Sequence, residues 1–470
     1  MVELWLALQP HFSLWLALAW GAYLVWLAGW IVLQKREPVA TLSWIMSLAL
    51  LPVLGLLVYH LLGPTRIRRQ RIRRHRARSL VDERHYAARL AGPAGGLSRL
   101  AQASSSFPPS SAERVQLLVG GACTFDAIVE AIEAARFHIH LEYYIFDADR
   151  TGARIRDALV ARARAGVAVR LLVDAIGSAG LTNAFLAPLR EAGAEVVYFH
   201  RFRLRRLWRP RLNLRSHRKL VIVDGRIGFT GGINISDTEN EAVRADAFHD
   251  LHLRLEGEAV RWLQLAFAED WGYACGSAPK DAEQWPDFPV GPVRMQVLPA
   301  GPDMPWEPIH RVMVSALHGA RERIWLATPY FVPGEAARMA LTSAALRGVD
   351  VRLLVPAHSD SALVSAAARS YFDELVSAGV RVYEFPAMLH SKALLVDAST
   401  CILGSSNFDN RSFRLNFELS VLIEDAGVAT ALEAVLARDL ERAVRVPENR
   451  RPRLPAALAE ATARLLSPLL

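Results

Sequence analysis

The chain has 470 residues, with 55 Lys or Arg, 47 Asp or Glu and a formal net charge of +8, so it is long enough for two or three domains with buried cores. Its three cysteines, Cys123, Cys275 and Cys401, show no CxxC spacing. This pattern argues against a disulfide framework or a zinc site and suits a reducing compartment.

Two apolar segments near the N-terminus predict membrane-spanning helices. Residues 12–33 and 40–62 contain no acidic residue, Lys or Arg, and each matches the roughly 20 helical residues that cross a hydrocarbon core. A cleaved signal peptide fits the first segment poorly, because no basic region precedes it and a second apolar segment follows at once. We expect residues 1–65 to form a two-helix transmembrane hairpin.

An arginine-rich segment follows the hairpin. Residues 66–78 contain eight Arg and no acid, whereas the loop between the spans offers only Lys35 and Arg36. The positive-inside rule therefore places the large C-terminal part in the cytoplasm. The same arginines suit anionic lipid headgroups, at about 1 kcal/mol each, although a topology signal without lipid specificity explains them equally well. A nucleic-acid arm is less favoured beside a membrane hairpin.

The remainder of the chain reads as two copies of one α/β lobe. Residues 103–111 form a polar stretch typical of a linker, so 66–112 is expected to be juxtamembrane segment and linker. A second linker at 276–292, with four prolines, separates lobes at 113–275 and 293–470. Three matched segments support the duplication: 133–146 with 318–331, 163–174 with 345–356, and 191–199 with 377–385.

The copies differ in length before their most polar motif. The first copy contains an insertion at 201–216 with seven Arg, which has no counterpart in the second copy. It suits a basic flap over an anionic substrate or, equally, a solvated loop.

The pattern His-x-Lys-x-x-x-x-Asp occurs once in each lobe. Its members are His217, Lys219 and Asp224 in the first copy, and His390, Lys392 and Asp397 in the second. Residues two apart on a strand share a face, so each His lies beside its Lys. The odd offset of each Asp points it off that face, which suits bracing of the following turn.

Each motif opens a predicted β-hairpin. Two-residue loops centred on 225–226 and 398–399 place His217 opposite Asn234 and His390 opposite Asn407. Small residues precede each Asn, including Gly231 in the first copy and Ser405 in the second, where the backbone could approach a ligand closely.

Acidic residues on the next strand suit the two imidazoles. Asp250 aligns with Glu418, and a carboxylate that accepts the Nδ1 proton fixes the histidine tautomer. The alternating His138, His140 and Glu142 resemble metal ligands, but without an evident further ligand they favour packing or support of the site.

Two His, two Lys and two Asn predict a pocket for a phosphodiester. The Lys and Asn side chains would hold the non-bridging oxygens and stabilise developing charge. One His can attack phosphorus while the other protonates the leaving oxygen and then deprotonates the incoming alcohol. The lysines supply the positive charge, so neither a metal nor another cofactor is expected.

The doubled motif with its downstream Asn residues resembles the phospholipase D superfamily. Segments "LEYYIF" at 141–146, "GGINISD" at 231–237 and "GSSNFDNRSF" at 404–413, with the N-terminal hairpin, resemble the bacterial cardiolipin synthase branch. The resemblance implies an α/β fold in which two tandem lobes, each a mixed sheet flanked by helices, pack pseudo-symmetrically behind a transmembrane hairpin.

The resemblance also implies a reaction, in which two phosphatidylglycerol molecules give cardiolipin and glycerol in a bacterial inner membrane. His217 would form a phosphatidyl-histidine and His390 would be the general acid and base, although the reverse assignment fits the symmetry equally. Lys219, Lys392, Asn234 and Asn407 would bind phosphate. Exclusion of water and a high local concentration of lipid hydroxyls would favour transfer over hydrolysis.

Three classes of alternative remain at this stage: a related enzyme with the same pocket, a protein that acts on nucleic acid, and a non-catalytic scaffold. A hydrolase with the same pocket would pass the intermediate to water, and a related transferase would use another donor such as phosphatidylethanolamine. A membrane-tethered nuclease or nucleic-acid binder is more remote, because the chain outside 66–78 is nearly neutral. A non-catalytic scaffold would not need His217.

Overall fold

The computed structural model describes residues 2–33, 38–50, 95–200, 214–277, 279 and 285–467. The chain divides into two compact units, one formed by residues 1–69 with 204–213 and the other by 70–203 with 214–470. The second unit contains both expected lobes. The arginine-rich segment 66–78 and residues 201–213 of the insertion lie outside the described residues.

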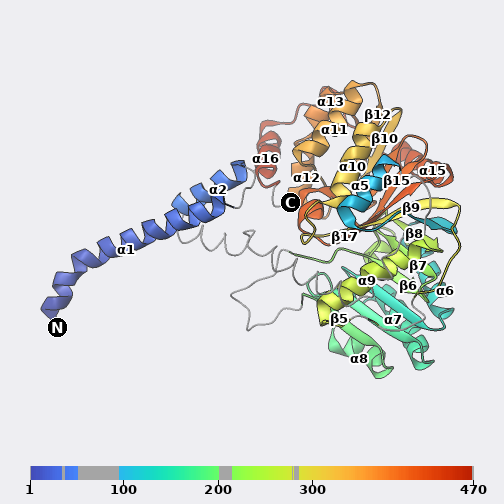
Figure 1. Cartoon of the computed structure of the whole chain (residues 1–470). Helices are drawn as coiled ribbons and strands as arrows, with labels where there is room; N and C mark the ends of the chain where they lie inside the picture. The colour runs from blue at the N-terminus through green and yellow to red at the C-terminus, as the bar shows by residue number, and fades with distance from the viewer. Residues whose placement is uncertain are drawn as a thin grey trace. The chain divides into compact units, whose positions relative to one another are not determined.

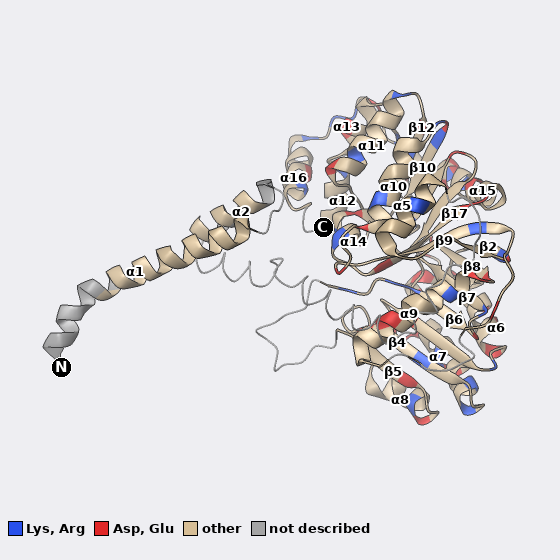
Figure 2. Cartoon of the chain, in the orientation of Figure 1, with Lys and Arg blue, Asp and Glu red and all other residues tan. Residues whose placement is uncertain are grey.

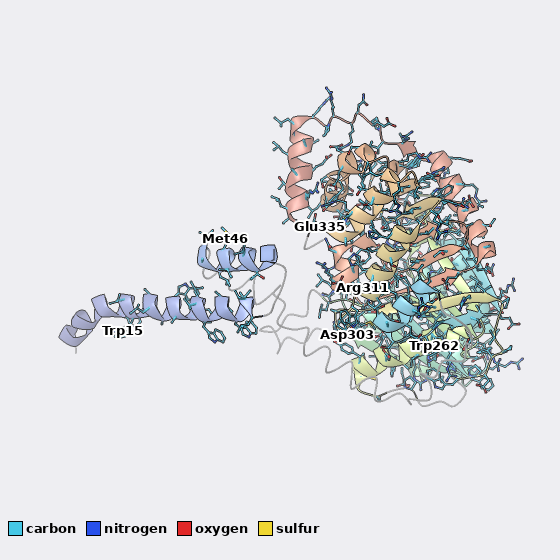
Figure 3. The ribbon with its side chains drawn as sticks, turned by 45° about the horizontal axis from the view of Figure 1, so that its top comes forward. Trp15, Met46, Trp262, Asp303, Arg311 and Glu335 are labelled. Atoms are coloured by element: carbon cyan, nitrogen blue, oxygen red, sulfur yellow. The ribbon has the colours of Figure 1, made fainter. Side chains whose placement is uncertain are left out.

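The first unit contains two apolar helices, α1 (Val2–Val32) and α2 (Pro38–Leu50). Residues Leu14–Val32 of α1 are long and apolar enough to cross a membrane. Trp15 projects outward from this helix (Figure 3). Leu27 and Ile31 of α1 form a small cluster with Leu48 of α2. Most of the second expected span, 51–62, lies outside the described residues.

The second unit is built on two large sheets with one shared strand order. The first sheet runs β2-β8-β7-β6-β3-β4-β5, and the central seven strands of the second run β9-β17-β15-β14-β10-β12-β13. In each sheet three parallel strands adjoin an antiparallel meander. The same order in both sheets confirms the mixed α/β fold of two tandem lobes.

The strands of the first lobe are β2 (Arg114–Val119), β3 (His138–Tyr143), β4 (Ala168–Asp174), β5 (Glu195–Phe199), β6 (Leu220–Val223), β7 (Ile227–Gly231) and β8 (Leu251–Glu256). Its helices are α6 (Gly121–Glu133), α7 (Arg150–Arg164), α8 (Asn183–Glu191), the short η3 (Asp237–Glu239) and α9 (Ala259–Cys275).

The strands of the second lobe are β9 (Val293–Ala300), β10 (Arg323–Ala327), β11 (Phe331–Val332), β12 (Asp350–Pro356), β13 (Arg381–Phe385), β14 (Ala393–Val396), β15 (Thr400–Gly404), β16 (Phe408–Asp409), β17 (Glu418–Glu424) and β18 (Val444–Arg445). Its helices are α10 (Pro308–Gly319), α11 (Glu335–Leu346), α12 (Ala362–Arg369), α13 (Phe372–Ser377), α14 (Asn410–Arg414), α15 (Ala426–Arg442) and α16 (Leu454–Leu465).

The two lobes share one apolar core. Helix α9 lies between the sheets, in contact with β5 and β6 of its own lobe and β9 of the other (Figure 1). Helix α15 similarly contacts β2 across the lobe boundary. Trp262 of α9 is fully buried in this shared core among side chains of both lobes (Figure 3). Because both faces of each sheet are covered, the middle strands β6 and β14 are continuous apolar runs.

The stretch expected to link the membrane segment to the first lobe is instead structured. Residues 103–105 end helix α5 (Gly96–Ser105), and strand β1 (Ser110–Ala112) pairs with β9 at the edge of the second sheet. Ala101 of α5 is buried in the second lobe's core. The polar serines that suggested a linker are satisfied locally, for example by Ser105 Oγ donating to the Ala101 carbonyl at 2.7 Å.

Candidate active site

Each histidine motif is held by the opposite lobe. The backbone N–H of His217 donates to the carbonyl of Phe417 at 2.8 Å, and the N–H of His390 donates to the carbonyl of His249 at 2.7 Å. These bonds form parallel bridges at Ser216 with Phe417 and at His249 with Leu389. The loop that precedes each motif therefore runs beside the carboxylate strand of the other lobe.

The bridges create crossed imidazole–carboxylate pairs. His217 Nδ1 lies 3.0 Å from Glu418 Oε2, and His390 Nδ1 lies 2.7 Å from Asp250 Oδ2. Both carboxylates are fully buried. An Nδ1–H that donates to a carboxylate leaves Nε2 of each ring free to attack or to carry a proton. The sequence predicted these two carboxylates near the imidazoles without indicating that each partner comes from the opposite lobe.

The two lysines are buried beside the imidazoles. Lys219 Nζ donates to the His217 carbonyl at 2.8 Å, and Lys392 Nζ donates to the His390 carbonyl. Lys392 Nζ also lies 3.7 Å from Asp250 Oδ2. Burial and the charge of Lys392 lower the pKa of Lys219 to about 7, and burial also lowers the pKa of Lys392. The charge of Lys392 therefore acts on Lys219, and an anion bound between the two side chains would offset this repulsion.

The charges of the two halves act on both histidines. Burial lowers the pKa of His217, and the lysines of both lobes add to this effect against Glu418. Burial and Lys392 lower the pKa of His390 to about 4, while Asp250 opposes the shift. Both rings are therefore neutral in the unliganded site, and each becomes easier to protonate when an anion offsets the lysine charges.

The two motif hairpins are each shifted by one residue from the predicted register. Val223 pairs with Ile227 and Val396 with Thr400, so each loop contains three residues. Regular pairing ends before the histidines, and neither His pairs with its Asn in these ladders. The predicted pairing of His217 with Asn234 and of His390 with Asn407 was therefore wrong in register, although both Asn side chains are buried within the same small-residue segments.

The two asparagines have different surroundings. Asn234 Nδ2 donates to Glu239 Oε1 at 2.6 Å, and its Oδ1 accepts from the Ile145 N–H at 3.3 Å. Asn407 is also buried, but among the described residues its Oδ1 has no hydrogen-bond partner. Of the two asparagines, Asn407 is therefore the one whose amide oxygen is unsatisfied among the described residues.

The motif aspartates lie at the turns. Asp224 accepts from the N–H groups of Arg136, Phe137 and His138 at 2.8 to 2.9 Å. Asp397 accepts in the same way from the N–H groups at 321–323. Both aspartates have positive φ, 53° and 52°, which these bonds compensate. Their position agrees with the expected bracing role, and they touch neither imidazole.

The small residues before each Asn make room for protein groups. A Cβ on Gly231 would lie 2.6 Å from the Leu251 carbonyl oxygen, and a Cβ on Gly232 would lie 2.3 Å from the carboxylate of Asp250. The groups that closely approach these glycines therefore belong to the neighbouring segment of the protein. The sequence had suggested a ligand in this place. In the second lobe Ser405 donates through Oγ to Glu418 at 2.5 Å, and its carbonyl lies 3.0 Å from His217 Nδ1.

Glu239 is a pocket residue that the sequence pattern did not reveal. Its Oε2 lies 3.8 Å from His390 Nδ1 and has no hydrogen-bond partner among the described residues. Burial and Asp250 raise its pKa to about 8, so it carries a proton at neutral pH. The aligned position in the second lobe is Ser412, so the duplication offered no signal for this residue.

Arg218, between His217 and Lys219, was also missed. Its fully buried guanidinium pairs with Asp270 of α9 and donates to the carbonyls of Glu418 at 3.0 Å and Ala300 at 3.2 Å. It therefore joins the first motif to two strands of the second lobe. Strand alternation places Arg218 on the face opposite to His217 and Lys219, where the sequence suggests a solvent-exposed side chain. No local pattern indicates that this opposite face is covered.

The two histidines of β3 are packed in the protein interior. His138 and His140 are buried with ring centroids 4.6 Å apart, and Glu142 accepts from Ser216 Oγ at 2.5 Å, next to His217. Elsewhere, ligand atoms of Glu239, Asp250 and His390 lie within 4.8 Å of one another, a spacing compatible with a metal. The Lys392 ammonium beside Asp250 already places a positive charge there.

Comparisons with known proteins agree with the duplicated architecture. The family described as "Cardiolipin synthase, PLD-like domain" matches residues 128–271 and 313–440, and the family described as "Phospholipase D-nuclease N-terminal" matches 22–64. Cardiolipin synthase 2 of Bacillus anthracis is 38% identical over 94% of this chain and 88% of the relative. Cardiolipin synthase of Geobacillus sp. (strain WCH70) is 37% identical over 95% and 92%.

A solved structure also resembles the fold. Phosphatidylserine synthase of Haemophilus influenzae Rd KW20 aligns with a TM-score of 0.61, covering 80% of this chain and 100% of that chain at 14% identity. At this identity the likeness concerns the fold alone.

The lysine pair predicts that anion binding takes up protons. Above pH 7 the Lys219 amine is largely neutral, and a bound anion would raise its pKa and restore the ammonium form. Dimethyl phosphate, which is fully ionised at this pH, should therefore bind at pH 8 with uptake of most of one proton and bind more weakly as pH rises. Calorimetry in buffers of different ionisation enthalpy measures the uptake.

Two variants make this measurement specific. Lys219→Gln should abolish most of the uptake, whereas Lys280→Gln, which alters a lysine outside both motifs, should leave it unchanged. Binding without proton uptake in the unaltered protein would contradict the proposed charge state.

Proposed function

The chain belongs to the family of bacterial cardiolipin synthases within the phospholipase D superfamily, and from this premise we propose how its site transfers a phosphatidyl group from one phosphatidylglycerol to another. The chain is a phosphatidyltransferase of this family, and its products are cardiolipin and glycerol. The observation that carries the mechanism is the crossed pairing of His217 with Glu418 and His390 with Asp250. It orients both imidazoles, one from each lobe, within a site that holds two buried lysines.

In the first step, Nε2 of His217 attacks phosphorus and the P–O bond to one glycerol headgroup breaks. Glu418 and the Ser405 carbonyl hold the Nδ1 proton, so Nε2 has a free lone pair. Lys219, Lys392 and the Nδ2 amide group of Asn407 donate hydrogen bonds to the phosphoryl oxygens and stabilise the charge that develops on them. The product of this step is a phosphatidyl-histidine and free glycerol.

His390 transfers the protons. It gives a proton to the departing glycerol oxygen and later takes one from the hydroxyl of the second phosphatidylglycerol, which attacks phosphorus and releases His217. In the unliganded site the pKa of His390 is about 4, chiefly through burial and Lys392. The phosphate charge offsets Lys392, and the carboxylate of Asp250 next to His390 favours its protonated form.

Transfer dominates hydrolysis because a diester is exchanged for a diester and the acceptor determines the outcome. Both histidines and both lysines are buried, so water has limited access to the intermediate. A lipid hydroxyl held at the membrane surface is by contrast present at high local concentration. The hydrolase and the transferase with another donor remain distinguishable outcomes of the first experiment below.

The membrane arrangement completes the proposal. The apolar helix α1 associates the chain with the bacterial membrane. We propose that residues 12–33 and 40–62 both cross it and that the lobes lie on the cytoplasmic side, as the eight arginines at 66–78 indicate.

Purified full-length protein in vesicles of phosphatidylglycerol should produce cardiolipin and glycerol in equal amounts, measured by lipid mass spectrometry and a glycerol assay. His217→Ala should lower the rate by about 10³-fold or more, because the nucleophile is lost. His358→Ala, at an exposed histidine outside the pocket, should not change it. Phosphatidic acid as the main product would identify a hydrolase, and activity only with added phosphatidylethanolamine would identify another donor.

The roles of the two histidines can be separated with a donor whose leaving group needs no acid. His390→Ala should react with phosphatidyl-p-nitrophenol, release one equivalent of nitrophenolate in a burst, and retain a phosphatidyl adduct in acid-quenched intact-mass spectra. The double variant His217→Ala/His390→Ala should form none. An adduct on His217→Ala but not on His390→Ala would reverse the assignment, and an adduct on the double variant would exclude both histidines.

The proposed sidedness can be read from the native cysteines. Cys123 and Cys275 are exposed on the lobes, so a membrane-impermeant maleimide should label them in inside-out vesicles and not in sealed spheroplasts. With both replaced by serine, Lys35→Cys in the loop between the spans should give the opposite pattern. Labelling of Cys275 from outside sealed cells would refute the cytoplasmic placement.

A further inference from the structure

Helix α16 turns an apolar stripe toward solvent. Leu454, Leu458, Ala461 and Leu465 follow one another at intervals of four, three and four residues, which places them on one face of the helix. All four are exposed, and the three leucines are 73%, 59% and 79% accessible. Figure 1 shows α16 on the outside of the second lobe, near α12 and α13.

The charged residues of α16 instead contact the protein. Glu460, the one acidic residue in the sequence of the helix, is buried and ion-paired with Arg450. Arg464 donates to the Ser370 carbonyl at 3.1 Å and lies 4.4 Å from the centre of the Tyr371 ring. This arrangement is the reverse of an ordinary surface helix, which buries its leucines and exposes its charges. The anchoring contacts show that the exposed stripe is a fixed feature of the fold.

The exposed charges directly before the helix are basic, whereas the acidic Asp373 and Glu374 beside it are ion-paired with Arg450 and Arg464. Arg451 and Arg453, just before the helix, are exposed, and residues 450–467 contain four Arg against the single Glu460. Most of α16 carries no charge, as its tan ribbon shows (Figure 2). Leucines on one face with arginines beside them match an anionic bilayer, whose headgroups attract the arginines and whose acyl chains accept the leucines.

The same helix is attached to the wall of the catalytic pocket. Asn410 Nδ2 donates to the carbonyl of Ser467, directly after α16, at 3.3 Å, and Tyr371 donates to Ser467 Oγ at 2.9 Å. Asn410 follows the pocket residue Asn407 by three positions. Tyr371 also packs edge-on against Phe331, which stacks on Phe408.

We propose that α16 is an interfacial membrane anchor, which inserts Leu454, Leu458 and Leu465 at the headgroup boundary of an anionic bilayer while Arg451 and Arg453 contact the lipid phosphates. A second copy of the chain is a poorer occupant, because two stripes facing each other would bring the same arginines together. The anchor would hold the segment with Asn407 next to the surface from which lipid substrates come. This role in delivering substrate rests on the proposed function, whereas the insertion itself does not.

The depth of the helix can be measured in the full-length protein independently of turnover. In a Cys123→Ser/Cys275→Ser background, an NBD label at Leu458→Cys should shift to the blue and be quenched by lipids with a shallow acyl-chain nitroxide, in vesicles that contain phosphatidylglycerol. A label at Glu191→Cys, on the exposed end of α8 in the other lobe, should do neither. Arg451→Gln/Arg453→Gln should reduce the quenching at position 458.

Two results would overturn the anchor. One is a label at 458 that remains in water in the vesicles. The other is disulfide cross-linking between two chains of the unlabelled Leu458→Cys variant, which would identify a second copy as the occupant. If the anchor is confirmed but no cardiolipin forms, the proposed function fails and the anchor stands.

An activity comparison tests the role in substrate delivery. Leu454→Asp/Leu458→Asp should lower the rate on vesicle phosphatidylglycerol by about 10-fold, in line with a lost interfacial contact. The same variant should retain its rate on monomeric dioctanoyl phosphatidylglycerol, which needs no bilayer. Leu346→Asp, at an equally exposed leucine of α11, is the matched control and should affect neither substrate. Equal loss on both substrates would contradict delivery from the membrane.

Discussion

The exchange of carboxylates between the lobes is the constraint that organises this protein. Neither lobe contains a complete catalytic imidazole, because His217 is oriented by Glu418 and His390 by Asp250. The pairs also offset part of the free-energy cost of burying two carboxylates and two imidazoles. Each carboxylate accepts a hydrogen bond from the imidazole that it faces. A buried pair is lost if one member is withdrawn, so separation of the lobes would remove the carboxylate partner of both imidazoles at once. The shared apolar core around α9 is the physical reason that the lobes stay together.

The same crossing explains why apparently unrelated residues are buried around the motifs. Arg218 holds the β17 and β9 backbones through two carbonyls, while Asp270 neutralises its charge. Glu142 holds Ser216, which bridges to Phe417. These groups do not touch the pocket that phosphate would enter. They maintain the registration of the two lobes, and an error of even 1 Å in that registration would separate an imidazole from its carboxylate.

Charge and membrane together account for the choice of substrate. The pocket contains two buried lysines, and the charge of Lys392 helps to lower the pKa of Lys219, so both side chains would stabilise a bound anionic diester. The lipid tails impose a second condition, since the diester is available only at a bilayer surface. The apolar helix near the N-terminus is suited to contact with the bilayer, and so is the leucine stripe of α16 near the other end of the sequence.

The sequence by itself determined the doubled lobe, the identity of the His, Lys and Asn residues, and the two carboxylates that orient the rings. It could do so because these features are repeated, and because strand periodicity places alternate residues on one face wherever the strand is regular. The tertiary structure decided which carboxylate serves which histidine, because the partners lie 201 and 140 positions apart and local patterns contain no information about pairing between lobes. It also decided the hairpin register: the side chains of Asp224 and Asp397 bind backbone N–H groups of distant segments, and these bonds stabilise a three-residue loop with positive φ that turn preferences alone did not predict. Glu239 and Arg218 were found only in the folded chain, since neither is repeated and the burial of their side chains depends on the tertiary packing.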